Sequence, residues 1–209
     1  MKIVIIGGVA GGASAAARLR RLDEQAEIVV FERTGYMSYA NCGLPYYIGG
    51  VIRDEADLTL QTPESFYARF RINVRVRQEV TSIDRAAKTV SVRPLDGGSP
   101  YTEHYDKLIL SPGARPVKPP LPGVDSARVF TLRTVEDTLR LRAQAMSAGS
   151  GSAVIVGGGF IGVELAENFR ELGLRVTIVE KQPQLLGQFD ADMVSFLHAH
   201  LREKGVGLL

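Results

Sequence analysis

The chain has 209 residues, 45% of them hydrophobic, which is enough to bury the core of one large domain or of two small ones. Its formal net charge is +2 and its acidic and basic residues are interspersed, which indicates neither a nucleic-acid-binding stripe nor an acidic tail. No apolar stretch is long enough to span a bilayer, and the apolar start is too short for a signal peptide. One cysteine rules out an internal disulfide and favours a reduced, cytoplasmic setting, and with three scattered histidines it predicts no metal site.

The first 33 residues carry the pattern of a dinucleotide-binding unit. An apolar run, a glycine cluster, a helical stretch and a second apolar run lead to Glu32 at the end of an expected second strand. In such units the glycines let a pyrophosphate approach, the helix N-terminus attracts it, and the glutamate accepts hydrogen bonds from a ribose. Gly7 and Gly12 fit the first and third glycines of the motif, but Val9 stands at the second, where neighbouring glycines have to compensate. Taken alone, a structural glycine turn explains this copy nearly as well.

The only cysteine, Cys42, follows in the segment "SYANCGLPYY" at residues 38–47. A lone cysteine is most often an inert, buried small hydrophobe. The small Gly43 and the rigid Pro45 beside it would instead let a cofactor and a substrate approach the sulfur closely. Tyr46 and Tyr47 are expected to pack rather than to take part in chemistry.

The middle of the chain predicts a series of local elements. Thr62 as N-cap and Pro63 in the first turn predict a helix over residues 62–70. Strands are expected between residues 74 and 92, a hairpin turn at the "DGG" of residues 96–98, and a buried strand at 107–110. The proline-rich segment after residue 115 is typical of a stiff crossing between domains. A capped helix from 134 to about 147 precedes the flexible "AGSGS".

A second copy of the dinucleotide pattern covers residues 153–181 and is complete. Gly157, Gly159 and Gly162 supply all three glycines, and Glu180 ends the second strand. Two copies, each with its own glutamate, make the dinucleotide interpretation strong. We therefore predict an α/β protein with two Rossmann-like units. Beyond them, His198 and His200 fall near the end of an expected helix and are predicted to be solvated.

Four motifs carry a resemblance that extends over the whole chain: "GGVAGG", "SYANCGLPYY", "YDKLILSPGARP" and "VGGGFIGVELAEN". They resemble the flavin-dependent pyridine nucleotide-disulfide oxidoreductases. Within that family they are most similar to the single-cysteine branch, which includes coenzyme A-disulfide reductases, persulfide reductases, and NADH oxidases and peroxidases. The departure at Val9 also occurs in the pattern of this branch.

The resemblance implies a place for each cofactor. FAD would bind the first copy and NAD(P)H the second, and Phe160 would act as an aromatic gate over the flavin. The residues themselves favour NADH over NADPH, because the carboxylate of Glu180 can accept both ribose hydroxyls and would repel a 2′-phosphate. The implied cofactor-binding residues are Gly7, Gly8, Val9, Ala10, Gly11, Gly12, Glu32, Arg33, Val80, Ser111, Pro112, Gly113, Gly157, Gly159, Phe160, Ile161, Gly162, Glu180 and Lys181.

The resemblance also implies that Cys42 is catalytic. Two-cysteine relatives use Cys-x4-Cys, but Tyr47 stands at the second position here, so Cys42 has to pair with an external sulfur or form a sulfenic acid. We expect electrons to pass from NAD(P)H through the flavin to a Cys42 mixed disulfide with a small thiol, coenzyme A being favoured. The implied substrate-binding residues are Ser14, Arg18, Arg21, Ser38, Asn41 and Arg71.

Domain boundaries and the full length follow from the same resemblance. An FAD-binding domain is expected at residues 1–116 and an incomplete NAD(P)H-binding domain at 117–209, because family members continue further and dimerise through a C-terminal domain. The expected molecule is a cytoplasmic homodimer. Two alternatives stay open: an NADH oxidase or peroxidase, against which the lack of a histidine after the first glycine turn argues, and a flavin electron-transfer or redox-sensing protein.

Overall fold

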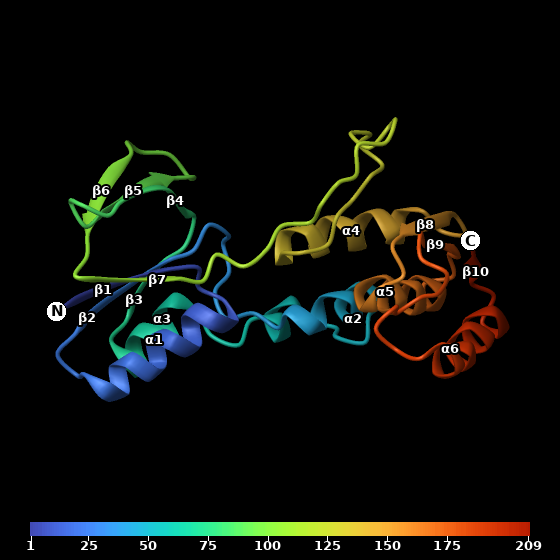
Figure 1. The fold of residues 1–209 in the computed structure, drawn as a ribbon, viewed down its shortest axis with the longest axis horizontal. Coiled ribbons are helices and arrows are strands. Elements are labelled where there is room, and N and C mark those ends of the chain that lie inside the picture. Colours follow the sequence, from blue (N-terminus) through green and yellow to red (C-terminus); the bar gives the residue numbers. More distant parts are fainter. The chain divides into compact units, whose positions relative to one another are not determined.

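The computed structural model describes residues 1–209, which fall into two compact units. Unit 1 comprises residues 1–40 and 59–117, and unit 2 comprises residues 41–58 and 118–209. The segment that carries Cys42 is therefore grouped with the second dinucleotide copy. Both units combine parallel strands with helices (Figure 1), which confirms the predicted α/β class.

Unit 1 is built on a four-stranded parallel sheet in the order β3-β2-β1-β7. One face of this sheet packs against helices, and the other packs against a three-stranded antiparallel sheet in the order β4-β5-β6 (Figure 1). The helix-side core includes Ile5, Ile28 and Phe66, and the opposite core includes Phe31 and Val92. The elements are β1 (Lys2–Ile6), α1 (Ala10–Leu22), β2 (Glu27–Phe31), α3 (Pro63–Phe70), β3 (Asn73–Arg75), β4 (Gln78–Asp84), β5 (Thr89–Pro94), β6 (Tyr101–His104) and β7 (Lys107–Leu110).

Unit 2 contains a three-stranded parallel sheet in the order β10-β9-β8 and four helices. A single core runs through it, from Ile48 on α2 through Phe169 on α5 to Leu201 on α6. The elements are α2 (Leu44–Gly49), α4 (Val135–Ser147), β8 (Ser152–Val156), α5 (Phe160–Glu171), β9 (Arg175–Val179), α6 (Ala191–Glu203) and β10 (Gly207–Leu208), with short 3-10 helices η1 (Asn41–Gly43) and η2 (Glu55–Leu58).

The local predictions of helices and turns are confirmed. Thr62 caps α3 and Thr134 caps α4, each in a reciprocal capping box with the residue three positions on. The "DGG" turn joins the antiparallel strands β5 and β6, with positive φ at Gly97 and Gly98. The strand at residues 107–110 forms as predicted, but it is not fully buried, because Leu110 at its end is 59% exposed.

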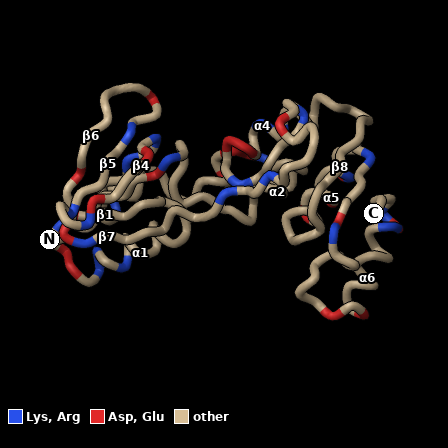
Figure 2. The backbone as a smooth tube through the Cα atoms, turned by 45° about the horizontal axis from the view of Figure 1, so that its top comes forward, with Lys and Arg blue, Asp and Glu red and all other residues tan.

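Charges are distributed rather than concentrated. Lys and Arg are interspersed with Asp and Glu in both units (Figure 2). The densest group lies in unit 1, where Glu103 of β6 bonds to Lys2 at 2.5 Å and to Arg75 at 2.5 Å. This group ties the antiparallel sheet to the parallel one. None of the helices combines the length and the hydropathy that crossing a membrane requires.

Candidate nucleotide and thiol sites

The glycine turn between β1 and α1 is dictated by its own packing. Gly7 has φ +99°, and a Cβ there would lie 1.9 Å from the carbonyl oxygen of Ser111. A Cβ on Gly12 would lie 1.8 Å from the carbonyl oxygen of Gly7. Only glycine fits either position, so this turn brings the helix N-terminus and the turn at residues 111–113 close together.

Val9 is explained by comparison with the second turn. Val9 and Gly159 are the N-cap residues of α1 and α5, respectively. A Cβ added to Gly159 would meet nothing within 4 Å. The middle position of the motif therefore has room for a side chain within the protein itself, and only a bound ligand would restrict it.

Glu32 is held by the first turn. It is buried at 7% exposure, and its Oε2 accepts a hydrogen bond from the Gly8 N–H at 2.8 Å. Its Oε1 accepts from the Thr34 N–H at 2.8 Å and from the Thr34 hydroxyl at 2.9 Å. A carboxylate has about four acceptor positions, so these contacts orient the group and leave capacity for a ribose hydroxyl.

Glu180 repeats this arrangement in unit 2. Its Oε2 accepts from the Gly158 N–H at 2.6 Å and its Oε1 from the Gln182 N–H at 2.8 Å. These backbone hydrogen bonds, that of Gly158 first, lower the pKa of Glu180. The carboxylate is therefore charged at neutral pH.

The loop after β9 closes on the second glycine turn. Leu186 donates its N–H to the Gly158 carbonyl at 2.9 Å, and the buried Leu185 donates its N–H to Nε2 of His198 on α6 at 3.2 Å. His198 was predicted to be solvated, and this prediction is wrong, because the imidazole supports the loop. His200 is exposed, as predicted.

The other predicted cofactor residues lie around these turns or on the surface. Ser111 donates its N–H to Ile6, next to the first turn, and Val80 lies at an irregularity of β4. Phe160 is 55% exposed and meets Phe189 edge-on, with ring centroids 6.0 Å apart. Exposed positions among the remainder are Ala10, Gly11, Arg33, Pro112, Gly113, Ile161 and Lys181.

Cys42 is exposed, so it is not the buried small hydrophobe that a lone cysteine most often is. It lies in η1, directly before α2, and α2 packs against α4 and α5. Tyr47 is buried, as predicted for a packing residue. Burial raises the pKa of Tyr46, and the negative charges of Glu164 and Glu167 on α5 add to this effect. The phenol of Tyr46 therefore stays protonated near the thiol segment.

Four of the predicted substrate residues in unit 1, namely Ser14, Arg18, Arg21 and Arg71, are exposed. Ser14, Arg18 and Arg21 are exposed at positions i, i+4 and i+7 of α1, which share one helix face. Arg20 points elsewhere: its Nε donates to the Phe70 carbonyl at 2.8 Å and its Nη2 to the Arg71 carbonyl at 3.1 Å. This bond brings the backbone of the exposed Arg71 next to α1.

Ser38 and Asn41 are both engaged by the protein. Ser38 has φ +45° and donates its N–H to the Gly8 carbonyl at 2.9 Å. Asn41, beside Cys42, accepts a hydrogen bond from Nη1 of Arg133 through its Oδ1 at 2.7 Å. Arg133 was not predicted from the sequence, nor was Arg142 of α4, whose guanidinium carbon lies 4.1 Å from the ring centroid of Tyr47. No local pattern signals contacts over such sequence distances.

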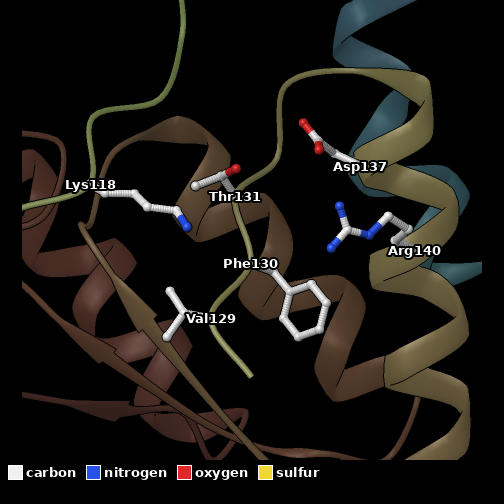
Figure 3. Close-up of a pocket in the computed structure, with 6 residues that line it drawn as sticks. All are labelled: Lys118, Val129, Phe130, Thr131, Asp137 and Arg140. Atoms are coloured by element: carbon white, nitrogen blue, oxygen red, sulfur yellow. The ribbon is translucent and has the colours of Figure 1, made fainter. Parts of the chain in front are cut away.

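One small pocket of unit 2 lies apart from the predicted residues. About 80 Å³ in volume, it is lined by Lys118, Val129, Phe130, Thr131, Asp137 and Arg140 (Figure 3). Ligand sites for cofactor-sized molecules are several times larger. The Asp137 carboxylate is also occupied, since it accepts from the N–H groups of Arg133 and Thr134 at 3.1 Å each.

Known proteins similar to this chain belong to the family that its motifs resemble. The family model described as pyridine nucleotide-disulphide oxidoreductase matches residues 1–209. A coenzyme A disulfide reductase of Staphylococcus aureus is 41% identical over 192 residues, which are 92% of this chain and 43% of that protein. The chain thus spans less than half the length of the curated relatives it matches.

Solved structures give the same result. Reduced CoADR-RHD of Bacillus anthracis superposes with a TM-score of 0.96 at 48% identity, over 100% of this chain and 38% of that one. The NAD-dependent persulfide reductase of A. fulgidus superposes with a TM-score of 0.94 at 36% identity, over 100% of this chain and 39% of that one. The water-forming NADH oxidase of Lactobacillus brevis, bound to NADH, superposes with a TM-score of 0.93 at 32% identity, over 100% of this chain and 46% of that one.

Proposed function

Because the chain belongs to the pyridine nucleotide-disulphide oxidoreductase family, we propose that its protein is an FAD-dependent enzyme that uses NADH to reduce coenzyme A disulfide or a coenzyme A persulfide through Cys42. The observation that carries the proposal is one exposed thiol, the only one in the chain, in a fold with two dinucleotide-binding turns. The names of the similar proteins support this substrate class.

The glycine turns fit the two cofactors. At Gly7 and Gly157 the positive φ that the turn needs is provided, and Glu32 and Glu180 present bound, oriented carboxylates beside them. Under this proposal the first turn, Glu32, Arg33, Val80 and residues 111–113 hold FAD, and the second turn with Phe160, Ile161, Glu180 and Lys181 holds NADH. The domains expected under this proposal are residues 1–116 and 117–209, although residues 41–58 are grouped with unit 2 in the structure. When bound, the flavin supplies two-electron redox chemistry between the nucleotide and the sulfur.

Cys42 performs the sulfur chemistry. Its thiolate attacks one sulfur of the substrate disulfide, the S–S bond breaks, and one coenzyme A leaves as a thiolate. Two electrons and a proton, drawn from NADH, then cleave the Cys42–coenzyme A mixed disulfide. The second thiol leaves and the Cys42 thiolate returns, so one NADH and one proton reduce one disulfide to two thiols.

The substrate surface follows from charge and exposure. Coenzyme A carries phosphates, which arginine binds in bidentate geometry. In unit 1, Ser14, Arg18, Arg21 and Arg71 offer exposed groups on and beside one face of α1. Ser38 and Asn41 precede Cys42 in the sequence. The homodimer and the cytoplasmic location stay predictions.

Replacement of Cys42 by serine in the full-length protein tests the proposal. We expect turnover of coenzyme A disulfide to fall by at least about 10³-fold, because the nucleophile is lost, while FAD stays bound and NADH still bleaches its absorbance. Mass spectrometry of the wild-type protein should find coenzyme A on Cys42. Near-normal turnover in the serine variant would refute the sulfur relay, and NADH consumption that needs only oxygen would favour the oxidase alternative.

A further inference from the structure

We propose that Arg133 is a positioning residue, which orients the side-chain amide of Asn41 so that both of its N–H donors stay available beside Cys42 for an acceptor atom of the substrate. The inference rests on the proposed function, because it gives the neighbour of the nucleophile a defined hydrogen-bonding role. It names a group of α4's N-terminal segment as part of the thiol site.

The orientation follows from the hydrogen-bonding chemistry of the two groups. Nη1 of Arg133 lies 2.7 Å from Oδ1 of Asn41, and the contact is partly buried. A guanidinium has donors only, so the amide oxygen has to face it. A flipped amide would set N–H against N–H beside a positive charge. Asn41 therefore keeps its Nδ2 group directed away from Arg133.

Arg133 is itself held in place. Its backbone N–H donates to Oδ2 of Asp137 at 3.1 Å, and the same carboxylate forms the capping box with Thr134. The guanidinium thus extends from the start of a capped helix, which limits its freedom. One charge-assisted hydrogen bond from such a support fixes the amide better than a bond between neutral groups does.

A second contact connects α4 with the helix that follows Cys42. The guanidinium of Arg142 lies over the ring of Tyr47 on α2 at 4.1 Å. Arg133 contacts Asn41, which precedes Cys42 in η1, and Arg142 contacts Tyr47, which follows it in α2. The two contacts therefore lie on either side of Cys42 in the sequence. The segment that contains Cys42 is therefore held by one contact at Asn41 and one at Tyr47.

The chemistry that Asn41 offers is then specific. It presents donors, so it recognises an acceptor: a carbonyl oxygen of the pantetheine arm, a phosphate oxygen or a thiolate sulfur. Asn41→Asp tests whether Asn41 acts as a donor or as an acceptor toward the substrate, because aspartate keeps the bond to Arg133 but has no N–H donors. Arg133→Lys keeps a donor toward Oδ1, whereas Arg133→Ala leaves the amide free to flip.

The experiment measures kcat/KM for coenzyme A disulfide with the full-length holoenzyme. We expect Asn41→Asp and Asn41→Ala to lose about 10-fold or more, Arg133→Ala a comparable amount, and Arg133→Lys less than about 3-fold. Arg140→Ala, which removes an exposed cation from α4 seven residues further along the chain, serves as control and should match wild type. Because the two groups act together, Asn41→Ala/Arg133→Ala should be no worse than Asn41→Ala alone.

Two further readouts separate positioning from folding. Thermal unfolding of Arg133→Ala should stay near that of Arg140→Ala, while the rate of Cys42 alkylation by iodoacetamide at a fixed pH should change in Arg133→Ala and not in Arg140→Ala. Pantethine, a disulfide without the nucleotide phosphates, identifies the acceptor: a loss retained with pantethine assigns a carbonyl or sulfur, and a loss seen only with coenzyme A disulfide assigns a phosphate.

Some results would overturn the inference. Full activity of Asn41→Asp would show that Asn41 acts as an acceptor, and an Arg133→Ala variant equal to Arg140→Ala in every readout would show that Arg133 positions nothing. Either result leaves the proposed function intact, provided that Cys42→Ser is inactive. An active Cys42→Ser variant would instead refute the proposed function itself.

Discussion

Under the proposed function, the charge of Glu180 would decide between NADH and NADPH. Hydrogen bonds from Gly158 and Gln182 lower the pKa of its carboxyl, so the group is ionised at neutral pH. A carboxylate at the end of β9 can accept both hydroxyls of an NADH ribose, and it repels the 2′-phosphate of NADPH. The neighbouring Lys181 is exposed, and an exposed ion pair contributes only about 0–1 kcal/mol.

We therefore expect NADH to be used at least about 10-fold better than NADPH, which corresponds to about 1.4 kcal/mol in transition-state binding. Glu180→Ala should narrow this gap by removing both the repulsion and the ribose contact. The measurement is kcat/KM for both nucleotides in wild type and variant, with Lys181→Ala as the matched control. A wild type that prefers NADPH would assign the choice to Lys181 or to another residue.

The predictability of a residue depended on the sequence distance of its partners. Glu32 and Glu180 follow from a local pattern, since each binds a turn 24 or 22 residues away within one β-turn-α-β unit. Arg133 acts on a residue 92 positions away, and Arg20 on one 50 positions away. His198 looked solvated because helical spacing says nothing about the loop that folds back onto it. Such contacts exist only once the core has formed.

At the scale of elements, the contact between α2 and α5 depends on a glycine. A Cβ on Gly49 would lie 1.9 Å from Oδ1 of Asn168, which is 1% exposed and cannot move outward. Its Nδ2 donates to the Glu164 carbonyl at 2.7 Å, which fixes the amide. The two helices therefore approach more closely than any other residue would allow.

Gly49→Ala should force α2 away from α5 and destabilise the protein by about 1–3 kcal/mol, as overpacking does. Because Cys42 directly precedes α2, its alkylation rate should change as well. Gly50→Ala is the control: Gly50 has φ +84° in open space, so alanine costs only backbone strain of about 1–2 kcal/mol. Urea unfolding of both variants gives the comparison. An unchanged alkylation rate in Gly49→Ala would show that α2 does not position the thiol.

The ion group between the sheets of unit 1 predicts a pH dependence. Burial raises the pKa of Glu103, but hydrogen bonds from Lys2 and Arg75 outweigh it, so the net pKa is lowered. A lowered folded-state pKa adds stability that is present above the unfolded value near 4.5 and is lost as the pH falls through the folded value. Glu103→Gln should therefore lower stability at pH 7 and flatten its decline below pH of about 5. Urea unfolding from pH 7 to pH 3 measures this pH dependence of stability. Glu27→Gln is the control, because Glu27 pairs with Lys2 but is exposed. Parallel stability curves for Glu103→Gln and wild type would contradict the prediction.

Elements were predictable where their signals are local. The caps at Thr62 and Thr134 and the turn at residues 96–98 each depend on three or four adjacent residues. Burial was less predictable, since the apolar run of β7 gave no sign that Leu110 would be 59% exposed. Nor did any pattern group residues 41–58 with the second dinucleotide copy, because that depends on the packing of α2 with α4 and α5.

At the scale of the whole molecule, the two glycine turns belong to separate compact units, each with its own hydrophobic packing. The cores of unit 1 center on β1, β2 and α1, and the core of unit 2 runs through α2, α5 and α6. A ligand stabilises the part of the protein that it binds, by about 2.7 kcal/mol at 100 times its dissociation constant. If FAD binds unit 1 and NADH binds unit 2, the two cofactors should therefore protect different parts of the chain.

Hydrogen exchange followed by mass spectrometry makes this testable. Added FAD should slow exchange of the backbone amides in β1, α1 and β7, and NAD⁺, which avoids turnover, should slow exchange in β8, α5 and β9. At 100 times the dissociation constant, exchange through local opening should slow by about 100-fold. Glu180→Ala should remove the protection by NAD⁺ and keep that by FAD, because both hydrogen bonds of its carboxylate come from residues of unit 2, Gly158 and Gln182. Glu32→Ala should do the reverse. Protection of β8 and α5 by FAD alone, with none from NAD⁺, would contradict the assignment of the two turns.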